Sequence, residues 1–228
     1  MLPHLPLSIS ILFVLITIVT VWLFYRATNY SRTALVVLVS WLALQAILSF
    51  AGFYQRTDTV PPRLALLIGP PLLVIISLFL SKKGQVFIDE ARLDQLTLLH
   101  SVRIVVEVVL LLLFIQKAVP KAMTFEGRNF DILAGLTAPL VYYLAFVRKK
   151  LSRRALLVWN GLCLGLLINI VLTALLAAPT AFQQTSFDQP NIAIQYFPFV
   201  WLPAVVVPIV LFSHLIAIRR LQNPPAAS

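Results

Sequence analysis

The chain has 228 residues, of which 60% are hydrophobic and only 11% are charged. Its mean hydropathy of +0.94 excludes an ordinary water-soluble domain. The net charge of +10 is divided among short polar segments between long apolar ones, so it does not indicate a nucleic-acid partner. The composition therefore predicts an all-α integral membrane protein whose main partner is the lipid bilayer.

Seven apolar stretches approach the length that a helix needs to cross a bilayer, which is about 20 residues. Two of them, the third and the fifth, are short and contain proline, which predicts kinks. The whole chain, 1–228, is predicted to be one transmembrane domain that ends in a short tail at 221–228. The predicted spans are 7–25, 33–53, 64–80, 96–115, 132–147, 155–178 and 197–218.

Basic residues are distributed unequally between the two sets of loops. The loops that follow the first, third and fifth predicted spans, together with the C-terminal segment, carry twelve Lys and Arg residues, whereas the other loops carry five. Basic residues concentrate on the cytoplasmic side of membrane proteins. The sequence therefore predicts an external N-terminus and a cytoplasmic C-terminus.

Two pairs of segments are similar to each other. Residues 31–37 resemble 152–158, and residues 71–83 align without gaps to 208–220. The similarity predicts three helices, one linking helix and three more helices in parallel orientation, an arrangement that places binding sites between the two repeats. A chance match between apolar segments is the alternative.

The fourth predicted span contains His100, Arg103 and Glu107. Their spacings of three and four residues place them on one helical face, with Arg103 and Glu107 positioned to form an ion pair. A charge at the bilayer centre costs about 2.5–3.5 kcal/mol, so such residues face the interior of the bundle. The pair predicts either a functional polar cavity or a contact that only locks the helices together.

Three other polar residues in the predicted spans are expected to join this cavity. Asn160 and His214 are predicted at the depth of His100, in the cytoplasmic third of the membrane. Asn169 is predicted near the middle, as Glu107 is. For the asparagines, simple hydrogen bonds between helices are the alternative. His100 and His214 at matching depth also leave open a pair of opposed haem or metal ligands. Because the chain has no haem or zinc motif, we predict no cofactor.

The two longer outer loops carry a second polar group, which we expect to form a vestibule above the cavity. Capping of the fifth span by Asp131 and turn formation near Asn191 are the alternatives. The predicted vestibule consists of Glu126, Arg128, Asp131, Asp188 and Asn191.

The stretches Met-Thr-Phe-Glu-Gly-Arg-Asn-Phe-Asp at 123–131 and Phe-Asp-Gln-Pro-Asn at 187–191 carry a family resemblance. With the charged fourth span and the proline-rich start of the seventh, they resemble a family of uncharacterised bacterial seven-helix membrane proteins. The similarity extends over about 96–221. It implies a location in the bacterial inner membrane and no particular activity.

These features predict a small transporter or channel-like protein built around a central polar cavity. A proton-coupled mechanism, with Glu107 as the proton carrier, is one form of this prediction. A membrane enzyme acting on a lipid-soluble substrate and a non-catalytic sensor or assembly protein are the alternatives. The chain lacks the Gly-x-Ser-x-Gly and P-loop motifs, which favours the non-enzymatic classes. The identity of the substrate and the oligomeric state stay open.

Overall fold

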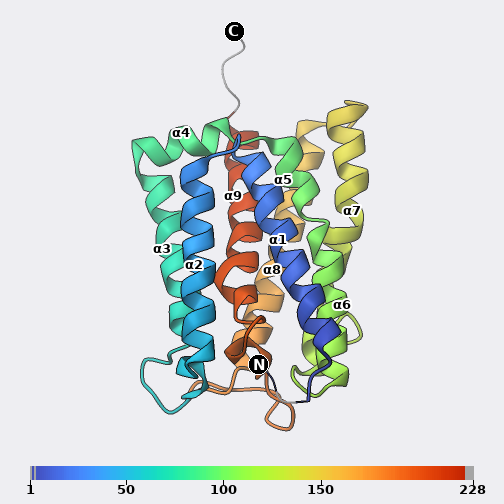
Figure 1. Ribbon diagram of the computed structural model, residues 1–228. Coiled ribbons are helices and arrows are strands. Elements are labelled where there is room, and N and C mark those ends of the chain that lie inside the picture. The colour runs from blue at the N-terminus through green and yellow to red at the C-terminus, as the bar shows by residue number, and fades with distance from the viewer. Residues whose placement is uncertain (1, 3, 224–228) are drawn as a thin grey trace.

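The computed structural model describes residue 2 and residues 4–223, and within these ranges the regular structure is entirely helical. Figure 1 shows the long helices running side by side, with the first helix of the chain starting near one end of the bundle and the last helix ending at the other. The α-helices are α1 (Leu7–Ala27), α2 (Arg32–Phe50), α3 (Ala65–Leu80), α4 (Lys82–Glu90), α5 (Leu93–Leu99), α6 (Val102–Ile115), α7 (Ile132–Tyr142), α8 (Arg153–Leu176) and α9 (Val207–Gln222). Shorter 3₁₀ or π-helical segments are η1 (Phe53–Gln55), η2 (Lys121–Met123), η3 (Tyr143–Val147), η4 (Ala193–Gln195) and η5 (Leu202–Val206).

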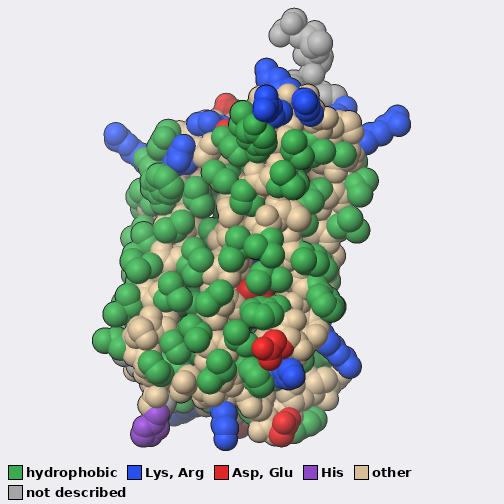
Figure 2. All heavy atoms as spheres, turned by 90° about the vertical axis from the view of Figure 1, so that its right-hand side faces the viewer, with side chains coloured by type: hydrophobic (Ala, Val, Ile, Leu, Met, Phe, Trp, Pro, Cys, Tyr) green, Lys and Arg blue, Asp and Glu red, His purple; other side chains and the backbone are tan. Residues whose placement is uncertain are grey.

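The bundle is compatible with a helical membrane protein. Five helical segments in the described ranges are long and apolar enough to cross a membrane, or six if the bent pair α3–α4 is counted as one span. Figure 2 shows apolar side chains covering the middle of one face, with Lys and Arg toward its two ends. The predicted all-α fold is confirmed, and each of the seven predicted stretches is helical over most of its length.

Two stretches differ from their predicted boundaries. Residues 82–90, expected in a loop, form α4, which bends by 93° from α3 and lies across the end of the bundle (Figure 1). Gly84 permits this bend, because a Cβ there would lie 2.2 Å from the carbonyl oxygen of Leu78. The helix of the seventh predicted span begins at Leu202 rather than at residue 197.

The predicted fourth span is two helices, α5 and α6, separated at His100 and Ser101. The backbone N–H of Arg103 bonds the carbonyl of His100, and that of Ile104 bonds the carbonyl of Ser101, so the chain tightens to i→i+3 bonding here. The irregular turn places His100 and Arg103 at the junction of two helices.

Helix α2 lies at the edge of the bundle, and only Gln45 and Ser49 are buried along it. The Ser49 hydroxyl donates to the carbonyl of Gln195, and the side chain of Gln45 accepts from Tyr54. Burial raises the pKa of Tyr54 to about 12, so its hydroxyl stays protonated and donates. Hydrogen bonds therefore supplement sparse apolar packing in holding α2.

Candidate functional site

A buried ion pair joins α6 to the start of α7. Nε of Arg103 donates to Oδ2 of Asp131 at 2.5 Å, and Nη2 donates to the other carboxylate oxygen. The two residues are only 2% and 5% exposed. The predicted pair between Arg103 and Glu107 is therefore replaced by a bidentate pair with Asp131, a residue predicted to lie in the outer vestibule or to cap a helix. The side chain of Asp131 makes no capping hydrogen bond.

The close approach of α7 to α6 makes this pair possible. A Cβ on Gly135 would lie 2.9 Å from the backbone nitrogen of Ile104 and 3.3 Å from Cβ of Arg103. Because glycine has no side chain, α7 passes directly over the turn of α6 that carries Arg103. Asp131, one helical turn before Gly135, then meets the guanidinium group.

His214 of α9 is the next member of the cluster, and its partners determine which ring nitrogen carries the proton. Nη1 of Arg103 lies 3.0 Å from Nε2 of His214, and a guanidinium group only donates. Nε2 therefore accepts, and Nδ1 donates to Oδ1 of Asn160 at 3.0 Å. The amide nitrogen of Asn160 donates to the carbonyl of Leu156 at 2.9 Å. His214 is thus held neutral in one tautomer by α6 and α8.

The ring of His100 stacks on the ring of His214, with centroids 3.8 Å apart and planes 13° from parallel. Trp159 packs edge-on against His100, with the two ring centroids 5.7 Å apart. A metal binds an imidazole in the plane of the ring, along the nitrogen lone pair, at about 2.0–2.1 Å for zinc. Two rings stacked face to face do not present opposed ligands, so the haem or metal arrangement considered for His100 and His214 does not fit this geometry.

Glu107 lies one turn further along α6 and binds Asn129, which is not among the predicted site residues. Nδ2 of Asn129 donates to Oε1 of Glu107 at 2.5 Å and to the carbonyl of Met123 at 3.0 Å. Oδ1 of Asn129 accepts from the backbone N–H of Asp131 at 3.0 Å. Asn129 is fully buried and links Glu107 to the Arg103–Asp131 pair. In the sequence, the indication that Asn129 belongs to the site was its position inside the Met-Thr-Phe-Glu-Gly-Arg-Asn-Phe-Asp stretch.

The predicted vestibule does not form as one group. Glu126, Arg128 and Asp188 are exposed at the surface, whereas Asp131 and Asn191 are buried. Asn169, predicted to line the cavity, is also exposed and donates to the carbonyl of Arg128 at 3.0 Å. The buried site thus consists of His100, Arg103, Glu107, Asn129, Asp131, Asn160 and His214.

A cavity of about 240 Å³ borders this cluster, and its lining is almost entirely apolar. Its walls come from α3, α6, α8 and the η5–α9 segment, and Glu107, Asp131 and Asn191 supply its charged or amide side chains. Four residues that line it are also exposed on the bundle surface: Leu72, Ile168, Leu172 and Leu175. The cavity therefore opens sideways, between α3 and α8. It differs from the polar cavity expected from sequence, because Arg103, His100 and His214 are packed behind its wall.

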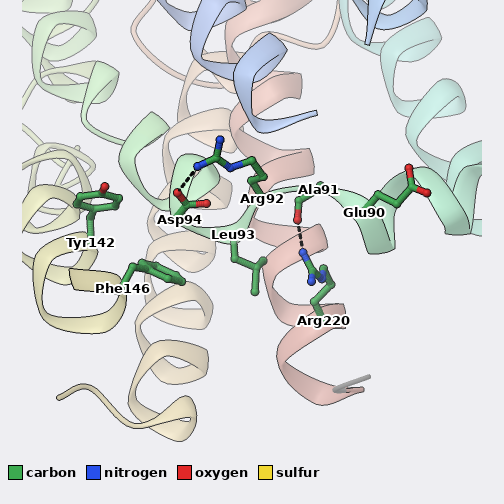
Figure 3. Close-up of a pocket in the computed structure, with 8 residues that line it drawn as sticks. All are labelled: Glu90, Ala91, Arg92, Leu93, Asp94, Tyr142, Phe146 and Arg220. Atoms are coloured by element: carbon green, nitrogen blue, oxygen red, sulfur yellow. Dashed lines mark hydrogen bonds and ion pairs between the residues drawn. The ribbon is translucent and has the colours of Figure 1, made fainter. Parts of the chain in front are cut away.

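A larger hollow of about 480 Å³ lies at the junction of α4 and α5 (Figure 3). Its two arginines are already engaged: Arg92 pairs with Asp94 at 2.9 Å, and Arg220 donates to the carbonyl of Ala91. Figure 3 shows Glu90 pointing away from both. These groups fix the turn between two helices and do not converge on a common point.

A family model described as a domain of unknown function, DUF8737, matches residues 61–222. The chain belongs to this family. The match includes α3 to α9 and every residue of the buried cluster. No curated protein and no solved structure matches the chain.

Proposed function

We propose that this protein is a seven-span membrane carrier for a small lipid-soluble molecule, which enters the cavity sideways from the bilayer. Besides the five long segments, α3 and the α7–η3 pair would each cross as a short span. We place the C-terminal end of the bundle in the cytoplasm, because the basic residues are concentrated at that end. The resemblance to uncharacterised bacterial proteins supports the inner membrane of a bacterial cell as the location.

The orientation predicts which engineered cysteines a membrane-impermeant thiol reagent reaches. In a Cys163→Ala background, Asp188→Cys should react in intact cells, whereas Lys150→Cys should react only after permeabilisation. Both native side chains are exposed, so access depends on the side of the membrane. The reverse labelling pattern would contradict the orientation.

The apolar cavity that opens between α3 and α8 is the single observation that carries the proposed function. An apolar cavity of about 150 Å³ holds a benzene molecule, so a volume of 240 Å³ accommodates roughly ten non-hydrogen atoms. A longer ligand would leave its tail in the lipid. An aqueous ion path is less well supported, because Arg103 and His214 are satisfied by Asp131 and Asn160 rather than facing an open passage.

One wall of the cavity is a π-helical segment. Leu202 and Pro203 of η5, with Val207 and Pro208 at the start of α9, line the cavity. Proline removes a backbone hydrogen-bond donor, and π-helical turns occur frequently at functional sites. Motion of this segment would open and close the cavity, as a carrier requires.

A direct test measures binding of 4-propyltoluene, an apolar probe of suitable size, to the protein in lipid nanodiscs, with empty nanodiscs as the partition control. Ala174 lines the cavity, so Ala174→Phe should fill it and weaken binding at least about tenfold. Ala43→Phe, at an exposed position on α2, is the matched control and should bind as the wild type does. Equal uptake by the wild type, both variants and empty nanodiscs would contradict the proposal.

A further inference from the structure

We propose that the ligand of the apolar cavity carries a hydroxyl group, and that Glu107 binds this hydroxyl. The inference rests on the proposed function, because it names the class of molecule that the cavity takes. Two buried oxygen atoms on residues that line the cavity carry it.

The first atom is Oε2 of Glu107. The side chain is 1% exposed and its other oxygen, Oε1, accepts from Asn129 at 2.5 Å, but Oε2 has no hydrogen-bond partner among the described residues. Glu107 lines the cavity. A buried polar group without a partner is costly, and most such groups in folded proteins are satisfied. A ligand in the cavity is positioned to supply the missing partner.

The second atom is Oδ1 of Asn191. The backbone N–H of Asn191 donates to the carbonyl of Ala177 at 2.8 Å, and its side-chain nitrogen donates to the carbonyl of Ala174 at 3.3 Å. These bonds fix the amide so that Oδ1 is the free end, and it has no partner within the described part of the chain. Asn191 is fully buried and lines the same cavity. An amide oxygen only accepts, so the ligand must donate to satisfy it.

A hydroxyl group fits Glu107 in either protonation state. Its single proton can go to one oxygen: the hydroxyl donates to an ionised Glu107, or it accepts from the O–H of a protonated Glu107 and donates to Oδ1 of Asn191. An ether or ketone oxygen only accepts, and an ammonium group only donates. The apolar walls add a requirement for a hydrocarbon body. The geometry therefore points to a lipid-soluble alcohol or phenol.

The test compares 4-propylphenol with 4-propyltoluene, which replaces the hydroxyl by a methyl group of similar size. In wild-type nanodiscs, after correction for partition into empty nanodiscs, the phenol should bind about tenfold more tightly. Glu107→Leu should abolish this preference while it retains binding of 4-propyltoluene, which shows that the cavity is intact. Glu107→Gln, which keeps the size of the side chain, should reduce the preference at least about threefold.

The outcomes separate the two proposals. Equal affinities for the two probes in the wild type, or a preference that survives both Glu107 substitutions, would overturn the hydroxyl assignment and leave the apolar cavity as a binding site. Absence of saturable binding for both probes in the wild type would overturn the proposed function as well.

Discussion

Replacing Asp131 with alanine is expected to lower the free energy of unfolding by about 3–5 kcal/mol, because it leaves the buried guanidinium group of Arg103 without its counter-charge. Arg103→Ala should have an effect of similar size. Unfolding by denaturing detergent in mixed micelles measures both. Asp188→Ala, at an exposed position, is the matched control and should change stability by less than about 0.5 kcal/mol.

The double substitution Arg103→Met with Asp131→Leu tests the pairing itself. Replacing a buried ion pair by apolar residues of similar volume is often neutral or stabilising, so the double variant should recover most of the stability lost by either single variant. Recovery would show that the two charges act on each other. Additive losses would contradict the pairing, as would single variants as stable as the wild type.

The second large effect is expected at Asn129. Asn129→Leu leaves three buried groups without their hydrogen-bond partner at once: Oε1 of Glu107, the carbonyl of Met123 and the backbone N–H of Asp131. Each buried group left unsatisfied costs about 1–3 kcal/mol, so the free energy of unfolding should fall by about 3 kcal/mol or more. The same detergent unfolding assay measures it.

Asn169→Leu is the matched control for Asn129. Its amide makes one hydrogen bond at the surface, to the carbonyl of Arg128, so the substitution should cost less than about 0.5 kcal/mol. A loss at Asn129 no larger than the loss at Asn169 would show that Asn129 does not organise the buried cluster.

The helices were predictable because hydrophobic length is a local property of the sequence. The structure brings His214 onto the ring of His100 and Asn160 onto His214. The partner of Arg103 was not predictable from spacing. The i, i+4 relation to Glu107 favoured a local pair, whereas the actual partner, Asp131, is brought in by the close approach of α7 at Gly135. Such a close approach of two helices depends on tertiary packing, about which the periodicity of a single helix gives no information.

Asn169 was wrongly predicted to line the cavity, and the sequence itself indicates that it does not. Asn160 and Asn169 are nine residues apart, which is two and a half turns of an α-helix. They therefore lie on opposite faces of α8, and burial of Asn160 implies exposure of Asn169. Both residues were predicted to line the cavity from their depth in the membrane alone, without regard to the helical face. The apolar cavity had no comparable signal, because side chains from α3, α6, α8 and α9 form it together.

The position of a bound brominated phenol in crystals of the protein tests the central claim most directly. The anomalous signal of bromine in 4-bromophenol marks the end of the molecule opposite its hydroxyl. We expect one strong peak inside the bundle, between α3 and α8, with the hydroxyl directed toward Glu107. Bromine peaks found only on the outer surface of the helices, with ordered water filling the cavity, would contradict a binding site for a lipid-soluble molecule.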